Sequence, residues 1–574
     1  MIPSCSNAYI AAFFRSSSRA CLVIVSIFAT VTPILAAPGQ LDPTFALSGK
    51  SVTSIVPFSN ALSGLAVQTD GKIVAAGSCL ADGGDFCIAR FNANGTLDTT
   101  FDGDGKVVTP IVPGANDWAP QIALQSDGKI VLAGSCRYGA NAAFAFCVAR
   151  YLNNGAMDGS FNGVGKVVVP FDPTIQSTIT TVIVQPNSRI LVGGYCSSGS
   201  SSQFCMQRYL QNGTLDGSFG DQGMFFPSIS AGTDNRIVGL ALQSDGKIVA
   251  AGSCGPVSGN HKFCAVRYSE FGVIDASFGT AGVADFAIGA GNNQPKAIGL
   301  QSSGSIVLSG ECQTDSGYQF CALRLQTDGV LDTTFGTSSG YTITAVQPGS
   351  DHFATAMIVQ PDDRILLAGS CGLGVGSSVC VHRTEANGVP DSTFGTGGRT
   401  STTYPGEGAM NQVTAASLQR DGRVLVGGYC GGGMIYSFCI VRFIGLAQDP
   451  LNCALNVDAD NAVLATTDAL LITRYLLGYR SNALTTGAVS ASPTRTNAEI
   501  ETYLGTLLQA GKLDVDGDGQ SLAMTDGLLL IRAMLGLSGT ALTNSATNAT
   551  HPNARNAQQI LTWIESTHGV ACLP

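Results

Sequence analysis

Clusters of positive charge are missing from this 574-residue sequence. Lysine and arginine number 30 against 40 acidic residues, the formal net charge is −10, and basic residues never form a run. Nucleic acids and anionic membranes are bound by clustered positive charge. The composition therefore argues against both kinds of partner.

Familiar catalytic signatures are also missing. Histidine occurs only five times, and the sequence has no Gly-x-Ser-x-Gly elbow, no His-Glu-x-x-His motif and no sialidase-type Asp box. An active site in a repeat protein should break the repeat symmetry with its own acid, base or nucleophile. His261, His352 and His382 fall at different places in the repeats described below and form no cluster. The pattern favours a non-catalytic protein. The sequence does not exclude a catalytic pair of carboxylates that folding brings together from different blades.

Long apolar runs are absent except near the N-terminus. There, arginines precede an apolar stretch over residues 21–37, which Pro33 interrupts. Such a pattern is typical of a secretory signal peptide, whereas a membrane anchor needs about 20 apolar residues. We assign residues 1–39 to the signal, with cleavage between Ala36 and Gln40. The mature chain is expected to lie outside the cytoplasm, secreted or on the cell surface, with no transmembrane segment.

Glycine, by contrast, is abundant, with 71 residues, while charged residues make up 12% of the chain. Glycine supplies the positive φ angles of tight turns, so this composition indicates a mainly β fold rich in turns. The length exceeds that of one ordinary domain, and at least two domains are expected.

Seven copies of one repeat fill residues 40–446. A Leu-Asp-x-Thr/Ser-Phe element, a Gln-x-x-Gly-Lys-like turn and a cysteine pair each occur seven times, with a period of 57 to 60 residues. Four strands per repeat at this period predict a seven-bladed β-propeller with four-stranded blades. In the second repeat, the expected strands are 105–112, 121–125, 129–136 and 146–152.

The ends of the repeat array suggest how the ring closes. One Leu-Asp-x-Thr-Phe element precedes the first complete repeat, and the last repeat stops at Phe443 without one. We therefore expect an N-terminal strand to complete the last blade. An open β-rich array that serves as a surface spacer is the alternative.

The repeated patterns Gln-Ser-Asp-Gly-Lys-Ile-Val, Arg-Phe/Tyr and Gly-x-Leu-Asp-x-Thr-Phe-Gly resemble the delta-60 repeat, a bacterial module predicted to form propellers. The resemblance covers about 400 residues and recurs in phase. It implies a propeller in an exported bacterial protein and implies no particular activity.

The cysteines indicate a disulfide framework. Two of the 18 belong to the signal, and the other 16 form seven in-repeat pairs plus one pair around the C-terminal segment. An even number of cysteines in an exported chain is typical of disulfides, whereas zinc would need ligands from different blades. The predicted bonds are Cys79–Cys87, Cys136–Cys147, Cys196–Cys205, Cys254–Cys264, Cys312–Cys321, Cys371–Cys380, Cys430–Cys439 and Cys453–Cys572.

One arginine also recurs in every repeat, together with the aspartate and phenylalanine of the Leu-Asp element. A residue present in every blade usually holds the blade together, so we expect an Arg–Asp or Arg–backbone contact and a phenylalanine between blades. The arginines are Arg90, Arg150, Arg208, Arg267, Arg324, Arg383 and Arg442.

Composition changes after Leu446 towards helix formers, and an acidic loop occurs twice, 58 residues apart. In each copy, side-chain oxygens alternate along the loop and a carboxylate opens the next helix. Calcium takes six to eight oxygen ligands, and a short curled loop points alternate side chains inward. The candidate ligands are Asp514, Asp516, Asp518, Gln520 and Asp526, and in the first copy Asn456, Asp458, Asp460 and Asp468. The expected helices are 469–477, 497–510, 527–537 and 554–567.

These loops resemble the Ca²⁺ loops of EF-hands and especially of dockerins, which are likewise duplicated. The resemblance implies a small α-helical calcium-binding docking domain over residues 447–574. Each loop is one residue longer than an EF-hand loop, and we expect Leu464 and Leu522 to point inward. The Ser-Thr pair common in dockerins is missing from both copies, which puts cohesin recognition in doubt. A solvated acidic turn without metal is the alternative.

The loops that lead into the second predicted strand of each repeat vary most. Amide, carboxylate and aromatic side chains on one rim suit a carbohydrate, although exposed turns are polar in most proteins. The candidate ligand-binding residues are Asn116, Asp117, Trp118, Asp234, Asn292 and Asp351.

Together these features predict an exported, monomeric, non-catalytic binding or scaffold protein. Its propeller would present a surface for a carbohydrate or a surface protein, and Ca²⁺ would fold a C-terminal docking domain. The alternative is a secreted polysaccharide hydrolase or lyase, because dockerin-like modules often accompany such enzymes.

Overall fold

A computed structural model describes most of the chain after the N-terminal segment. The described residues are 37–80, 84–138, 143–227, 231–289, 291–337, 339–347, 349–372, 376–404, 410–419, 422–432, 435–445, 453–459, 463–489, 493, 495–547, 551–568 and 572–573. The chain divides into two units, Met1–Leu35 and Ala36–Pro574. The predicted signal peptide therefore lies almost wholly outside the described residues.

Seven antiparallel sheets of four strands make up the larger part of the fold. Blade 1 contains β2 (Asn60–Val67), β3 (Ile73–Cys79), β4 (Asp85–Phe91) and β5 (Lys106–Thr109). Blade 2 contains β6 (Asp117–Leu124), β7 (Ile130–Tyr138), β8 (Ala143–Tyr151) and β9 (Lys166–Val169). Blade 3 contains β10 (Gln176–Val184), β11 (Ile190–Ser198), β12 (Ser201–Tyr209) and β13 (Met224–Phe225).

The remaining blades repeat this order of strands. Blade 4 contains β14 (Arg236–Leu242), β15 (Ile248–Cys254), β16 (Lys262–Tyr268) and β17 (Val283–Phe286). Blade 5 contains β18 (Asn293–Leu300), β19 (Ile306–Thr314), β20 (Gly317–Leu325) and β21 (Tyr341–Thr344). Blade 6 contains β22 (His352–Val359), β23 (Ile365–Cys371), β24 (Ser378–Thr384) and β25 (Arg399–Thr402). Blade 7 contains β26 (Met410–Leu418), β27 (Val424–Gly432), β28 (Ile435–Phe443) and β1 (Lys50–Thr53).

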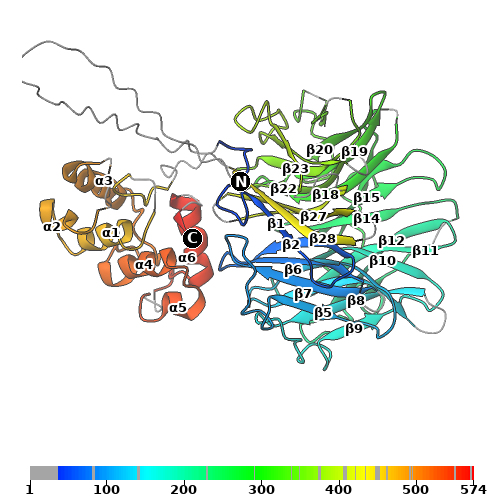
Figure 1. Ribbon diagram of the computed structural model, residues 1–574, viewed down its shortest axis with the longest axis horizontal. Coiled ribbons are helices and arrows are strands. Elements are labelled where there is room, and N and C mark those ends of the chain that lie inside the picture. The colour runs from blue at the N-terminus through cyan, green and yellow to red at the C-terminus, as the bar shows by residue number, and fades with distance from the viewer. Residues whose placement is uncertain are drawn as a thin grey trace, which may run out of the picture. The chain divides into compact units, whose positions relative to one another are not determined.

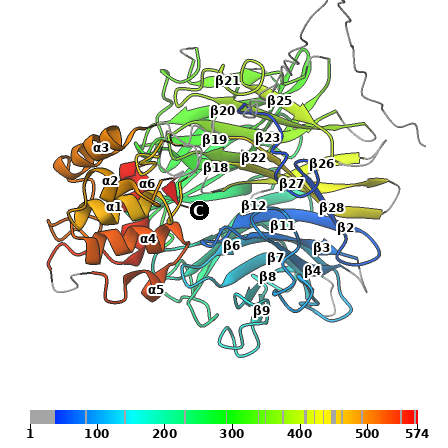
Figure 2. The same cartoon turned by 60° about the vertical axis from the view of Figure 1, so that its left-hand side comes forward.

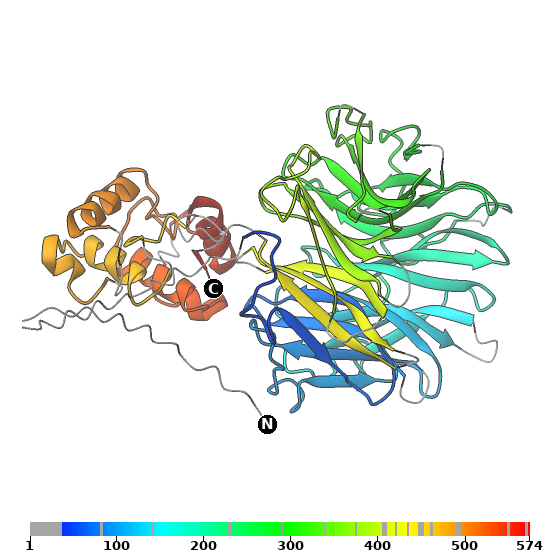
Figure 3. The ribbon, with the colours of Figure 1, turned by 45° about the horizontal axis from the view of Figure 1, so that its top comes forward.

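The blades form a closed ring. The first strand of each blade contacts the first strand of the next, and β26 of blade 7 contacts β2 of blade 1. In Figure 3 the colours run from blue through green to yellow around the blades, and the blue and yellow strands meet. The predicted seven-bladed propeller is confirmed, and the open array is excluded for this part of the chain.

The N-terminal strand closes the ring, as expected. Strand β1 pairs antiparallel with β28, with Lys50 opposite Val441. Upstream of β1, the N–H of Gly39 donates to the carbonyl of Ile444 at 2.7 Å. Figure 1 shows the blue β1 beside the yellow β28. Blade 7 is therefore built from both ends of the repeat array.

Two details of the predicted blade were wrong. The strand expected at 105–112 is the shorter β5, and it completes blade 1 instead of opening blade 2. The next strand, β6, starts four residues before the expected position 121. The register of β6 against β7 shifts between Trp118 and Gln121. This β-bulge breaks the alternation of side chains from which a strand start is inferred.

The recurring arginine binds the recurring aspartate in every blade. The seven pairs are Arg90–Asp98, Arg150–Asp158, Arg208–Asp216, Arg267–Asp275, Arg324–Asp332, Arg383–Asp391 and Arg442–Asp42, at 2.7–3.0 Å. Each guanidinium also lies 4.5–5.0 Å above the ring centre of the phenylalanine in the Leu-Asp element. These contacts confirm a structural role for all three residues.

In five of the seven blades, the basic residue of the Gln-x-x-Gly-Lys-like turn also binds this aspartate. Lys72, Arg189, Lys247, Arg364 and Arg423 do so at 2.6–3.4 Å. The Leu-Asp element and the Gln-x-x-Gly-Lys-like turn thus contribute to one ion cluster, in which the aspartate binds the recurring arginine and the basic residue of the turn.

All eight predicted disulfides are present. The seven in-repeat bonds each join the second and third strands of one blade, with Cα atoms 5.8–5.9 Å apart. The eighth bond, Cys453–Cys572, has its Cα atoms 5.1 Å apart. An extensive disulfide framework is consistent with a protein outside the cytoplasm.

The C-terminal segment is helical. Its elements are α1 (Asp468–Leu476), α2 (Ser481–Thr485), α3 (Asn497–Gln509), the π-helix η2 (Ala523–Gly527), α4 (Leu528–Met534), α5 (Gly539–Thr543) and α6 (Ala557–His568). Figure 2 shows these helices grouped together. Leucine, isoleucine, valine and alanine side chains from all of them except η2 form one buried core.

The four predicted helices are present, whereas α2 and α5, which have only five residues each, were not predicted from the sequence. None of the helices in the described part of the chain combines the length and apolar character needed to cross a membrane.

Candidate functional site

Three carboxylates converge in the second acidic loop. One carboxylate oxygen from each of Asp514, Asp516 and Asp526 lies within 4.8 Å of the other two. Asp516 and Asp526 are fully buried, and Asp514 is half-buried. Folding therefore gathers side chains that lie up to 12 positions apart in the sequence.

Glycines allow the first turn of this loop. The carboxylate of Asp514 accepts hydrogen bonds from the N–H groups of Gly517 at 2.9 Å and Gly519 at 3.1 Å. Both glycines have positive φ, +82° and +85°, which other residues adopt only with strain. A Cβ on Gly517 would also lie 2.8 Å from the carbonyl oxygen of Asn553. The glycines thus let the chain curl around the Asp514 carboxylate.

Asp526 ties the two ends of the loop together. Its Oδ1 accepts from the N–H groups of Val515 at 2.5 Å and Asp516 at 3.2 Å. Its Oδ2 accepts from the N–H of Leu522 at 2.7 Å and from the hydroxyl of Thr525 at 2.9 Å. Burial raises the pKa of this carboxyl although the hydrogen bonds oppose the shift.

The first loop repeats this arrangement 58 residues earlier. Asp468 accepts from the N–H groups of Val457 at 2.6 Å and Leu464 at 2.9 Å, and from the Thr467 hydroxyl at 3.1 Å. Burial, with a further contribution from the charge of Asp458, raises the pKa of Asp468 to about 6. Asn456 and Asp458 are buried, and Asp460 lies outside the described residues.

Asp518 and Gln520, the other predicted ligands of the second loop, do not belong to the cluster of three carboxylates. Oδ1 of Asp518, a largely buried residue, accepts from the N–H of Gln520 at 2.9 Å, and Gln520 itself is exposed. Leu464 and Leu522, expected to point inward, are each 46% exposed. Their backbone N–H groups, instead of their side chains, face the loop interior and bind the aspartates.

The donor set of the second loop fits calcium. Three carboxylates offer the hard oxygen ligands that Ca²⁺ prefers, and a bound divalent cation would offset the repulsion among charges held this close. Backbone N–H groups of the loop donate to all three carboxylates and orient them.

The candidate rim residues of the propeller lie where outer strands lead into the first strands of the next blades. Asn292 Oδ1 accepts from the N–H of His261 at 2.9 Å, and Asp351 Oδ1 accepts from the N–H of Tyr318 at 2.8 Å. Asp234 accepts a hydrogen bond from the Ser202 hydroxyl in the previous blade. Three of the candidate residues therefore also join neighbouring blades.

The remaining rim candidates are consecutive. Asp117 is fully buried, and its Oδ2 accepts from the N–H groups of Ile111 at 2.7 Å and Val112 at 3.0 Å. Burial, with a contribution from the charge of Asp85, raises the pKa of Asp117 to about 6. Trp118 is 54% exposed and Asn116 is half-buried. Of these three side chains, Trp118 is the one most open to a partner.

A charged pair on the inner strands was not predicted from the sequence. Lys296 lies at the β-bulge of β18, and its ammonium is 3.0 Å from Glu311 on β19. At the equivalent bulge, Thr180 and Thr414 instead donate to a carbonyl of the next blade. Burial raises the pKa of Glu311. Comparing the repeats position by position would have revealed this exception.

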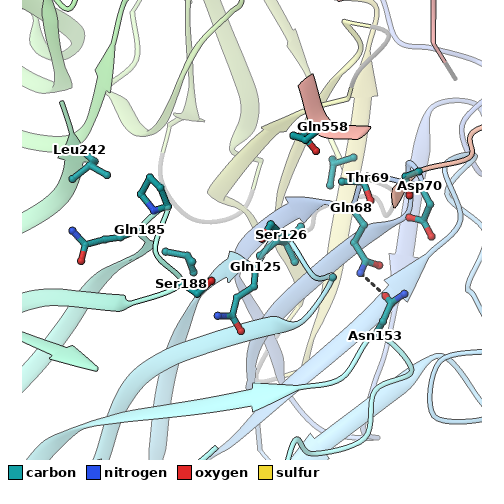
Figure 4. Close-up of a pocket in the computed structure, with 16 residues that line it drawn as sticks. Gln68, Thr69, Asp70, Gln125, Ser126, Asn153, Gln185, Ser188, Leu242 and Gln558 are labelled. Carbon is teal, nitrogen blue, oxygen red and sulfur yellow. Dashed lines mark hydrogen bonds between the residues drawn. The ribbon is translucent and has the colours of Figure 1, made fainter. Parts of the chain in front are cut away.

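A pocket at the opposite end of the first strands is lined by the repeated glutamines Gln68, Gln125 and Gln185 (Figure 4). The side-chain amide of Gln68 donates to Oδ1 of Asn153 at 2.7 Å. Because every blade carries this glutamine, the pocket reflects the packing of the turns more than a specific site.

Five of the seven repeats match a protein family described as a domain of unknown function (DUF5122) with a β-propeller fold. The matched segments are residues 68–101, 125–161, 185–219, 243–278 and 301–335. No curated protein matches the chain.

Solved structures similar to the chain include a protein of unknown function from Dyadobacter fermentans DSM 18053, with 12% identity, a TM-score of 0.40 and coverage of 70% of this chain and 100% of the other. The polysaccharide lyase Uly1 has 12% identity, a TM-score of 0.40 and coverage of 70% and 92%. An α-L-arabinanase from Penicillium chrysogenum has 11% identity, a TM-score of 0.37 and coverage of 68% and 98%. Similarity at this level carries no conclusion about activity or substrate.

Proposed function

We propose that this chain is an exported, non-catalytic binding or scaffold protein. Its propeller would present a surface for a carbohydrate or a surface protein, and calcium would organise the C-terminal helical domain for docking. The observation that carries the proposal is the convergence of the carboxylates of Asp514, Asp516 and Asp526 in one loop, with one oxygen of each within 4.8 Å of the others. When bound, Ca²⁺ would neutralise these carboxylates and lock the loop onto α4, so that its binding contributes to folding.

Large apolar side chains exposed at one end of the propeller strands support a binding surface there. Phe58 is 62% exposed, Trp118 54%, Tyr138 47% and Ile435 60%. All four lie in or beside the loops of blades 7, 1 and 2 at the end where the first strands begin. Exposed apolar groups gathered on one face are typical of interaction sites, and an aromatic ring beside amides suits a sugar or a protein loop.

The helical domain also exposes apolar residues, in matching places in its two halves. Leu477 and Leu535 follow α1 and α4 directly, and both are more than half exposed. Tyr479 and Leu537, two residues further on, are exposed as well. Apolar side chains kept on the surface of both halves support a role in docking a partner.

A polysaccharide array probed with the full chain tests the ligand proposal. We expect binding to at least one polysaccharide, and at least a tenfold loss of affinity in Trp118→Ala, because a central aromatic anchor typically contributes 2 kcal/mol or more. Phe226→Ala is the matched control, since Phe226 is also exposed but follows β13 in blade 3. Equal binding by Trp118→Ala and wild type would reject this face as the carbohydrate site.

The same polysaccharides, assayed for degradation products instead of binding, test whether the protein is an enzyme. Asp234 lies 3.3 Å from His261 and 2.7 Å from Arg236, and this group breaks the repeat symmetry, as does the Lys296–Glu311 pair. These two groups are the observations that favour a hydrolase or lyase. Release of reducing ends or unsaturated sugars by wild type, lost in Asp234→Asn, would replace the non-catalytic proposal.

A further inference from the structure

We infer that Arg495 and Arg555 are positioning residues that shape the two acidic loops for a cation. The inference rests on the calcium sites proposed above and adds residues that lie outside the loops. Arg495 and Arg555 come 39 and 41 residues after the first residues of their loops and shortly precede α3 and α6.

Arg555 binds three consecutive carbonyl groups of the second loop. Its Nη1 donates to the carbonyl oxygens of Asp514 at 2.7 Å and Val515 at 3.0 Å. Its backbone N–H donates to the carbonyl oxygen of Asp516 at 2.7 Å. With these carbonyls held towards the arginine, the side chains of Asp514 and Asp516 face the carboxylate of Asp526.

Arg495 makes the same three contacts in the first loop. Its Nη1 donates to the carbonyls of Asn456 at 2.6 Å and Val457 at 2.9 Å. Its backbone N–H donates to the carbonyl of Asp458 at 3.1 Å. The arrangement is therefore present in both halves of the domain, although the loop sequences differ.

An aromatic ring fixes each guanidinium in place. The guanidinium of Arg555 lies 4.4 Å from the ring centre of Trp563 on α6, and that of Arg495 lies 3.8 Å from the ring centre of Tyr503 on α3. In both halves the ring is eight residues after the arginine. Stacking of this kind holds the planar group in place, so that its Nη1 can donate to two neighbouring carbonyl oxygens.

Because Arg495 and Arg555 donate to main-chain carbonyls, they do not neutralise the carboxylates of the loops. An arginine beside an acidic loop would ordinarily pair with its carboxylates, but these guanidinium groups donate to main-chain carbonyl oxygens. The carboxylates thereby keep their oxygens directed at the cation position. Residues that orient metal ligands without touching the metal typically change affinity 10- to 100-fold when replaced.

Terbium luminescence tests the second loop separately. The chain has two tryptophans, so full-length protein with Trp118→Phe keeps only Trp563, the residue stacked on Arg555. Excitation of Trp563 sensitises Tb³⁺ bound nearby, and competition with Ca²⁺ yields the calcium affinity of this loop. We expect Arg555→Met to weaken calcium binding 10- to 100-fold, and Arg555→Lys to recover part of the loss because lysine can still donate to a carbonyl.

Arg532→Met is the matched control. Arg532 also donates to two carbonyls in this half, those of Leu542 at 2.9 Å and Asn544 at 2.7 Å, but not to the loop. Its replacement should leave the calcium affinity unchanged even where it lowers the melting temperature in EDTA.

Four results would overturn the inference. Tighter binding in Arg555→Met would mean that the arginine acts only as a repelling charge. Unchanged calcium affinity in Arg555→Met would mean that Arg555 does not position the loop. Equal weakening in Arg555→Met and Arg532→Met would mean that Arg555 acts only by stabilising the domain. If the wild-type protein gives no calcium-displaceable signal, the calcium proposal itself fails and the inference falls with it.

Discussion

Replacing Asp216 with alanine is expected to destabilise the propeller by about 3–5 kcal/mol, the usual effect of removing one partner of a buried ion pair. Asp216 binds Arg208 at 2.8 Å and Arg189 at 3.0 Å, and Arg208 is almost completely buried. The variant would leave the Arg208 guanidinium in the interior without a counter-charge. Chemical denaturation of the full chain at pH 7 measures the change.

Asp332→Ala provides the internal comparison for this prediction. In blade 5, Ser305 replaces the second cation, and the side chains of Arg324 and Asp332 are more exposed than those of the Arg208–Asp216 pair. We expect a smaller loss, about 1–3 kcal/mol. Equal losses of unfolding free energy in Asp216→Ala and Asp332→Ala would show that the second cation and the deeper burial of the blade 3 cluster add nothing to stability.

The same pair predicts how acid acts on the propeller. Burial alone would raise the pKa of Asp216, but hydrogen bonds from Ser218 and the charge of Arg208 hold it below its usual range. Because the folded pKa is lower than the unfolded value of about 3.9, this contribution to stability is complete above about pH 4 and is lost as the pH falls further. Asp216→Ala should therefore be less sensitive than wild type to pH below 4.

Replacing Asp117 with asparagine is expected to stabilise the propeller at pH 7, by about 2–3 kcal/mol. Asp117 is fully buried, and its Oδ1 has no hydrogen-bonding partner among the described residues. At the equivalent joint between blades 3 and 4, Asn235 donates to Oε1 of Gln203 at 3.0 Å. Ionised Asp117 cannot donate, and it faces Asp85, which raises its pKa further.

The pH dependence of this effect follows from the raised pKa, about 6. Between about pH 4 and 6 the folded protein binds more protons at Asp117 than the unfolded chain does, so wild-type stability falls as the pH rises through this range. Asp117→Asn should lack that slope. Melting temperatures between pH 4 and 8 test this, with the exposed Asp285→Asn as control. A variant less stable than wild type at pH 7 would contradict the prediction.

The propeller could be predicted because seven copies of one pattern keep their phase. The cysteine spacing, the Leu-Asp element and the incomplete last repeat were enough to predict the blades, their disulfides and the closing strand. The strand starts and blade boundaries were harder to predict. A periodic sequence does not show at which strand one blade ends and the next begins, and a bulge near Trp118 interrupts the alternation of side chains.

The acidic loops were predictable from local spacing, but their surroundings were not. Alternating oxygens point to Asp514 and Asp516 as ligands, whereas Arg555 lies 41 residues beyond the loop start. Only folding brings such a residue to the loop. The exposure of Leu464 and Leu522 was also unpredictable, because it depends on which backbone groups the aspartates bind.

Calorimetric titration of the full chain with Ca²⁺, after treatment with EDTA, tests whether calcium binds and organises the C-terminal helical domain. We predict two binding events in wild type and one in the double variant Asp514→Ala, Asp518→Ala, with a gain in helix measured by circular dichroism in both proteins. Absence of heat and unchanged helicity in wild type at millimolar Ca²⁺ would contradict the calcium-organised docking domain.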